Sequence, residues 1–280
     1  MIPAEFDYEV AKSAEDAIRL LGQSDDAKLL AGGHSLVPLM KLRLARPALL
    51  VDIGRIAALQ GVRDAGDHLE IGALTRHHDL ETNDLIKAHC PILAHTASLV
   101  GDRQVRHMGT IGGSCAHGDS ASDLPTVCQA LDATFVIQGA GGQRTVSAKD
   151  FFKGFFDTAL EGNEILTAIR VPKTTAGWSY LKFRTRALDW AMVGVAALVD
   201  RQNGSISGAR IALTNMGQIP IRASAVEQAL AGASIDKVGA AADHAAEGTD
   251  PPSDTWATAD YRKHLVRVLT RRAVEEALGR

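Results

Sequence analysis

Thr110-Ile111-Gly112-Gly113-Ser114-Cys115-Ala116-His117-Gly118-Asp119 contains a Gly-Gly pair, and a second pair lies far upstream in Ala31-Gly32-Gly33-His34-Ser35-Leu36. Paired glycines let the backbone adopt positive φ angles and leave no Cβ in the way of a ligand. Successive N–H groups in such a turn can form a nest that binds an anion. Two such loops could hold the two phosphates of one dinucleotide from two sides. Two ordinary strand-to-helix turns are the alternative.

The residues around the first loop predict a small α/β unit. Residues 28–31 form a short apolar strand that leads into the loop, and residues 36–44 form a short helix that Pro47 ends. A strand at residues 6–8, a helix capped by Ser13 and a strand at residues 49–53 complete the unit.

The rest of the chain is predicted to contain a central and a C-terminal region. Around the second loop we expect a strand at 69–73, helices at 91–100 and 126–131, a hairpin that turns at 139–142, and a strand at 165–171. After a polar boundary at 173–177 come three β segments, 178–185, 191–199 and 206–214, and then helices at 223–230, 237–246 and 261–278. This order indicates a three-stranded sheet with helices packed on one side.

Composition excludes several classes of protein. A length of 280 residues suggests two domains, and a net charge of −3 gives no electrostatic basis for binding nucleic acid. The longest apolar run, 191–199, is far shorter than the roughly 20 residues of a membrane span. The first residues lack the basic and apolar regions of a signal peptide, and the odd cysteine count fits a reduced compartment, so we expect a cytoplasmic protein.

The motifs exclude further kinds of site. Cys90, Cys115 and Cys128 are scattered and form no CxxC, so we expect neither a zinc site nor an iron–sulfur cluster in this chain. No Rossmann fingerprint or P-loop is present. Ser114, His117 and Asp119 lie too close in sequence to be a hydrolase triad, and no catalytic residue is assigned.

Four polar residues near these segments have open roles. His34 and His117 flank the Gly loops and either contact a cofactor or lie at the rim of a pocket. Asp123 and Lys182 lie near apolar segments. Each is either a functional charge or an ordinary one, on the surface or in a salt bridge.

The sequence resembles the FAD-binding medium subunit of molybdenum hydroxylases (the xanthine dehydrogenase family), of the carbon monoxide dehydrogenase type. The resemblance runs from end to end and is carried by both Gly motifs in their order and by the segments 6–8, 50–53, 106–114, 119–123, 164–170, 182–189, 213–215 and 261–273. It implies an α+β fold: an FAD-binding domain of the PCMH or vanillyl-alcohol-oxidase type at 1–175, with α/β subdomains of about 1–53 and 54–175, and a C-terminal α/β domain at 176–280 resembling that of the CO dehydrogenase flavoprotein.

The same resemblance implies non-covalently bound FAD. The residues it assigns to the pyrophosphate are Ala31, Gly32, Gly33, His34 and Ser35 from the first loop and Thr110, Ile111, Gly112, Gly113 and Ser114 from the second. It also counts Leu36 and Val100 among the cofactor-binding residues. It matches Asp123 to an acidic contact and Lys182 to a cationic contact of the cofactor, and it places Leu166, Asp189 and Trp190 near the flavin ring. Two of these depart from the usual pattern, since relatives carry Asn at Ser114 and Tyr at Trp190.

The implied function is electron transfer. Relatives receive electrons from the [2Fe-2S] clusters of a small subunit, and these clusters receive them from a molybdopterin centre on a large subunit. The three subunits assemble as dimers of heterotrimers. We expect an external acceptor such as a quinone. A self-sufficient FAD-dependent oxidoreductase and an FAD-retaining scaffold remain alternatives. The basic residues of the last helix, Arg262, Lys263, Arg267, Arg271 and Arg272, are expected to lie in part against the other subunits.

Overall fold

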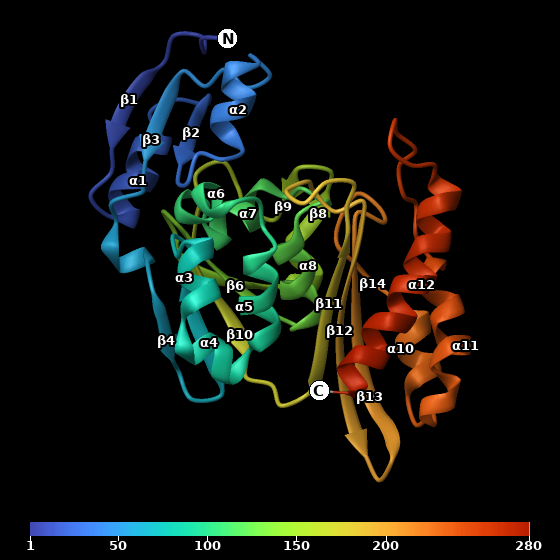
Figure 1. Cartoon of the computed structure of the whole chain (residues 1–280). Helices are drawn as coiled ribbons and strands as arrows, with labels where there is room; N and C mark the ends of the chain where they lie inside the picture. Colours follow the sequence, from blue (N-terminus) through green and yellow to red (C-terminus); the bar gives the residue numbers. More distant parts are fainter. Residues whose placement is uncertain (280) are drawn as a thin grey trace.

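A computed structural model describes residues 1–279 of the chain. Within these residues the strands form a three-stranded, a five-stranded and a four-stranded sheet and a two-stranded ribbon. The three sheets follow one another along the chain, and the N-terminal sheet lies apart from the other two across a boundary near α2, α6 and α7 (Figure 1). No described helix combines the length and apolarity needed to cross a bilayer.

The N-terminal sheet is parallel, with strand order β1-β3-β2. Its elements are β1 (Asp7–Val10), α1 (Ala14–Leu21), β2 (Ala27–Leu30), α2 (Leu36–Lys41) and β3 (Leu49–Asp52). Parallel neighbours require crossover connections, and the two short helices provide them. Ser13 caps α1 by accepting a hydrogen bond from the backbone N–H of Asp16, and the apolar side of α1 packs on the sheet, so the predicted α/β unit is confirmed.

The central sheet is antiparallel, with order β4-β5-β10-β6-β7. Its strands are β4 (Val62–Asp64), β5 (His68–Gly72), β6 (Thr134–Gly139), β7 (Gly142–Ser147) and β10 (Ile165–Pro172). The predicted hairpin at residues 139–142 joins β6 to β7. A short 3-10 helix, η1 (Ala57–Leu59), connects β3 to β4.

Helices cover one face of this central sheet (Figure 1). They are α3 (His77–Thr82), α4 (Asp84–His89), α5 (Pro91–Ser98), α7 (Ile111–His117), α8 (Asp123–Ala130) and α9 (Ala148–Phe151). A further helix, α6 (Arg103–Met108), lies beside α3 and has no buried residue. The ribbon of β8 (Phe152–Gly154) and β9 (Asp157–Thr158) follows α9. The apolar side chains of α3, α4, α5, α7, α8 and α9 form one core with those of β5, β6 and β10.

The C-terminal sheet is antiparallel and contains the three predicted strands, β11 (Gly177–Phe183), β12 (Val193–Gln202) and β13 (Ser205–Thr214). A fourth strand, β14 (Ile221–Arg222), pairs with β13. Two residues are too few to show an alternating pattern, so the sequence did not reveal β14. The helical elements are α10 (Ser224–Leu230), η2 (Ile235–Lys237), α11 (Val238–Ala242), η3 (Asp243–Ala246) and α12 (Ala259–Leu278).

Both faces of the C-terminal sheet are buried. On β12, Val195, Ala197 and Val199 pack against the C-terminal helices, whereas Ala196 and Leu198 belong to the core of the central unit. Side chains alternate along a strand, so a continuous apolar run is what a doubly covered strand requires. The sheet therefore joins the C-terminal helices to α5 and α8 and holds β11 against the central unit.

Candidate functional site

The structure brings the two Gly loops into contact. The first loop, residues 31–35, follows β2, and the second, residues 110–114, begins α7. A Cβ atom on Gly32 would lie 2.3 Å from the carbonyl oxygen of Met108. A Cβ on Gly113 would lie 3.9 Å from the Cβ of Ala31. Only glycine at position 32 allows this close approach, which places both loops at the boundary between the N-terminal and central units (Figure 1).

The first loop presents a run of unused hydrogen-bond donors. Within the described residues, no acceptor of the chain bonds the backbone N–H groups of residues 32–36. Gly33 adopts a φ of +73°, and the His34 ring nitrogen Nδ1 lies 2.9 Å from the carbonyl oxygen of Gly32. Four of these residues are partly buried and His34 is exposed, and the last two begin α2, where N–H groups have no partner within the helix, so an external acceptor can reach them. Five successive free donors fit an anion such as a pyrophosphate.

The second loop differs, because most of its donors are already used. The N–H of Ile111 donates to the carbonyl oxygen of Thr75, and that of Gly112 to the carbonyl oxygen of Ala73. The N–H of Gly113 donates to Oγ1 of Thr110 at 3.1 Å. The expected pair of equivalent nests is therefore not present. The second loop instead forms a tightly packed wall, to which Ser114 adds a side-chain hydroxyl.

Asp123 and Lys182 form a buried ion pair. Asp123 begins α8 and Lys182 lies on β11; their side chains are 4% and 3% exposed, and Oδ2 lies 2.7 Å from Nζ. Lys182 also donates to the carbonyl oxygen of Leu99 at 3.3 Å, beside Val100. The sequence left the roles of Asp123 and Lys182 open, and the structure shows that they form a salt bridge with each other in a buried position.

Tyr180 extends this ion pair into a polar network. Its hydroxyl donates to Oδ1 of Asp123 at 2.7 Å and lies 3.1 Å from Oγ1 of Thr214, which donates to Thr126. Burial raises the pKa of Asp123, while the Lys182 ammonium and the Tyr180 hydroxyl act in the opposite direction. We did not single out Tyr180 from the sequence. Its position two residues before Lys182, hence on the same face of a strand, was the available signal.

The connection between β11 and β12 carries Asp189 and Trp190. Trp190 is 57% exposed, and a carboxylate oxygen of Asp189 accepts a hydrogen bond from the backbone N–H of Arg186. This connection lies at the same end of the molecule as α2, α6, α7 and the β8–β9 ribbon (Figure 1). Leu166 is buried on β10.

The rim of this end includes two aromatic residues that the sequence analysis missed. Phe155 and Phe156, in the turn of the β8–β9 ribbon, are exposed, and the ring of Phe156 lies 4.7 Å from that of His117. Burial lowers the pKa of His117. His117 is thus a half-buried residue at the C-terminal end of α7, which agrees with the rim role considered for it.

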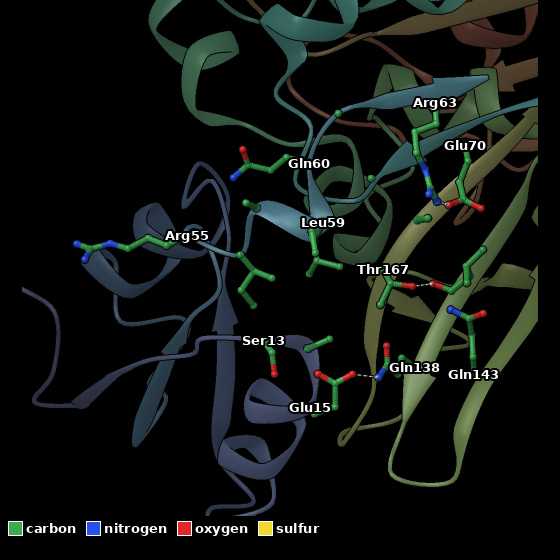
Figure 2. Close-up of a pocket in the computed structure, with 18 of the residues that line it drawn as sticks. Ser13, Glu15, Arg55, Leu59, Gln60, Arg63, Glu70, Gln138, Gln143 and Thr167 are labelled. Carbon is green, nitrogen blue, oxygen red and sulfur yellow. Dashed lines mark hydrogen bonds and ion pairs between the residues drawn. The ribbon is translucent and has the colours of Figure 1, made fainter. Parts of the chain in front are cut away.

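A crevice of about 740 Å³ lies elsewhere, between the N-terminal unit and the uncovered face of the central sheet (Figure 2). Its polar lining includes Arg55, Arg63, Glu70, Gln138 and Gln143. Glu15 bridges the two units there by accepting a hydrogen bond from Gln138 (Figure 2). Neither Gly loop lines this crevice, so its size does not identify the cofactor site. The unpaired donors of residues 32–36 lie outside it and are the candidate for binding an anionic group.

One basic residue lies where the sequence analysis did not place it. Arg262 is one of the basic residues expected to lie in part against the other subunits, but it is 1% exposed and buried within this chain. Its guanidinium donates to the carbonyl oxygen of Met192 and to Asp254. The reason is geometric: the side chain of Arg262 lies on the stripe of α12 that faces the sheet.

Comparison with known proteins agrees with this geometry. Residues 4–174 match the family model described as the FAD binding domain in molybdopterin dehydrogenase, and residues 178–277 match the CO dehydrogenase flavoprotein C-terminal domain. The carbon monoxide dehydrogenase medium chain of Hydrogenophaga pseudoflava is 43% identical, over 100% of this chain and 99% of that protein. The glyceraldehyde dehydrogenase medium chain of Sulfolobus acidocaldarius is 39% identical, over 99% of each.

A solved structure extends the likeness to three dimensions. It is carbon monoxide dehydrogenase from Hydrogenophaga pseudoflava lacking the Mo-pyranopterin moiety of the molybdenum cofactor, and the matching chain superposes with a TM-score of 0.97 at 45% identity, covering 100% of this chain and 99% of that one. The chain therefore belongs to the family of FAD-binding medium subunits of molybdenum hydroxylases, of the carbon monoxide dehydrogenase medium-chain type.

Proposed function

We propose that this chain binds one FAD non-covalently at the contact between its two Gly loops. The five unpaired N–H groups of residues 32–36 are the observation that carries the proposal, because they offer the pyrophosphate the donors that the chain itself leaves unused. Residues 110–114 would form the opposite wall. Val100, Asp123, Leu166 and Lys182 would lie toward the flavin, with Asp189 and Trp190 covering it.

The chain's own residues would bind and orient the cofactor, and no side chain is assigned to bond making. FAD, when bound, supplies the redox chemistry. The buried Asp123–Lys182 pair would fix a charged group at the flavin site without exposing it to water. The exposed rim of Phe155, Phe156 and Trp190 would limit access from solvent.

The proposed role is electron transfer within a larger enzyme. Electrons would enter from [2Fe-2S] clusters on a small subunit, supplied by a molybdopterin centre on a large subunit, and leave to an external acceptor such as a quinone. Relatives named as medium chains or medium subunits support this division of labour. We propose a dimer of heterotrimers, in which residues 1–175 form the FAD-binding domain and residues 176–280 the C-terminal domain.

Purification of the intact complex at low and high salt tests the proposal. We expect FAD, iron and molybdenum, two further polypeptides, and a native mass far above the 29.7 kDa of this chain. A monomer whose flavin is fully reduced by a substrate with no other polypeptide present would contradict it and favour a self-sufficient oxidoreductase. A monomer that retains FAD without any turnover would favour a scaffold.

A further inference from the structure

Backbone carbonyls at the end of the β11–β12 connection are held from two directions. The side-chain amide of Asn215, at the end of β13, donates to the carbonyl oxygens of Ala191 at 2.8 Å and Met192 at 3.3 Å. Asn215 adopts a φ of +59°, which directs its backbone out of the strand. The buried guanidinium of Arg262, from α12, donates to the carbonyl oxygen of Met192 at 2.5 Å.

Arg262 ties the same point to the start of α12. Its second donor bonds Oδ2 of Asp254 at 2.5 Å, while Oδ1 of Asp254 accepts the backbone N–H groups of Trp256 and Ala257. The remaining guanidinium nitrogen, Nε, is buried without a partner within the described residues. A guanidinium with two charged or carbonyl partners in a buried site has a fixed direction.

Trp256, just before α12, contacts the first part of the β11–β12 connection through Arg186. The guanidinium carbon of Arg186 lies 5.7 Å from the centre of the Trp256 ring, within the range of a cation–π interaction. The backbone N–H of Arg186 donates to Asp189 at 3.0 Å. The loop is therefore held at its start through Arg186 and at its end through Met192, both times by residues 254–262. We call Asn215, Asp254, Trp256 and Arg262 the loop clamp.

The two large apolar side chains between these points have little packing of their own, whereas the small Ala191 is buried. Leu188 is 59% exposed and Trp190 is 57% exposed. Burial of its own ring therefore does not determine where Trp190 lies. The backbone beside it does, and this backbone is fixed by the buried Ala191 and by the polar bonds at the two ends of the loop.

We propose that Arg262 is a positioning residue, which acts through the carbonyl of Met192 and with the rest of the loop clamp to hold Trp190 against the flavin. The proposal rests on the proposed function. It assigns the C-terminal domain a role at the cofactor: α12 sets the orientation of the aromatic ring that covers it, although no clamp residue is assigned to the cofactor site.

Flavin fluorescence in the purified complex tests this proposal, because an indole stacked on a flavin quenches its emission. The variants are Arg262→Met, Arg262→Lys, Asn215→Gly and Trp190→Phe, with Arg271→Met as the control on the exposed face of α12, where Arg271 pairs with Glu275. Asn215→Gly keeps the positive φ and removes only the amide, so it is the variant least expected to disturb folding.

Arg262→Met and Asn215→Gly are expected to raise flavin emission about as much as Trp190→Phe does, and to leave FAD affinity within about threefold. Arg262→Lys, which retains a donor, is expected to restore most of the quenching. In the Trp190→Phe background neither substitution should raise emission further, which is the non-additivity expected of residues acting through one ring. Arg271→Met should leave emission unchanged.

Three results would overturn the proposal. The first is unchanged emission in both clamp variants. The second is an equal rise in the Trp190→Phe background, which would show that Arg262 acts on the fold in general. The third comes from the chain alone without cofactor: it is unchanged acrylamide quenching, in Arg262→Met and Asn215→Gly, of the part of the tryptophan emission that Trp190→Phe removes, since the chain has three tryptophans. A complex with no FAD would contradict the proposed function instead, and this third measurement would still test the clamp.

Discussion

Oδ2 of Asp123 lies 2.7 Å from Nζ of Lys182 in a region where both side chains are less than 5% exposed. The two residues are 59 positions apart and join α8 of the central unit to β11 of the C-terminal sheet. Burying two charges is favourable only when each retains good partners. Here Tyr180 supplies one further bond to the carboxylate and Leu99 one to the ammonium.

Asp123→Ala is expected to destabilise the fold by about 3–5 kcal/mol, because it leaves the Lys182 ammonium buried without a counterion. Denaturant unfolding measures this change. Glu275→Gln, which removes an exposed ion pair with Arg271, is the control and should cost less than about 1 kcal/mol. The double variant Asp123→Asn/Lys182→Met should lose less stability than Asp123→Ala. Equal losses in Asp123→Ala and the control would contradict a structural role for the pair.

Gly113→Val is expected to yield a colourless protein that still folds. A Cβ at this position would lie 2.7 Å from Oγ1 of Thr110, so the valine displaces the hydroxyl that caps α7, and its methyl groups enter the gap toward Ala31. Loss of the cap costs about 1 kcal/mol. Flavin absorbance per chain is the measurement. Gly141→Val, in a hairpin turn with no atom within 4 Å of the new Cβ, should retain the flavin. Full occupancy in Gly113→Val would count against the site.

Much of this fold was predictable because its signals are local. The cap at Ser13, the strand-to-helix turn after β2 and the hairpin at residues 139–142 each depend on residues a few positions apart. The shared pattern of the two Gly loops indicated that they could hold one dinucleotide from two sides, whereas their direct contact is seen only in the fold. The pairing of Asp123 with Lys182 was one of two roles left open, since sequence spacing does not show which distant charges meet.

The misses depended on tertiary contacts. A basic residue in an amphipathic helix is normally exposed, but Arg262 finds Met192 and Asp254 in the fold and is buried. The sequence also did not show that the N–H groups of the second Gly loop are bonded within the chain whereas those of the first are not. The carbonyls of Ala73 and Thr75 use up the N–H groups of α7, and only the fold brings these residues beside the second loop.

His77 should make stability depend on pH in the acid range. It is 5% exposed, and its Nδ1 has no partner among the described residues. Burial, with smaller contributions from His34, Arg76 and Arg106, lowers its pKa from 6.5 to about 4. Between these two pH values the unfolded chain binds a proton that the folded chain does not, so stability falls as the pH decreases. The loss sums to about 3 kcal/mol.

The free energy of unfolding, measured with urea at several pH values from 7.5 to about 4, checks this expectation. Carboxylates contribute to the same acid limb, so the difference between the wild-type chain and His77→Gln isolates the histidine. The two curves should converge as the pH falls below 6.5. His264→Gln, at an exposed position of α12, is the control for replacing a histidine by glutamine. Parallel curves for His77→Gln would show that His77 titrates equally in both states.

A quinone or an artificial dye should be a better electron acceptor than NAD. Residues 32–36 offer one set of unpaired donors, which the FAD pyrophosphate is proposed to occupy. The remaining glycine cluster, residues 139–142, forms an open hairpin turn and precedes no helix. The exposed side chains of Phe155, Leu188 and Trp190 suit an apolar ring rather than a charged dinucleotide. Steady-state rates of the intact complex with each acceptor at equal concentration decide the matter, and a rate with NAD equal to or above that with the dye would refute the prediction.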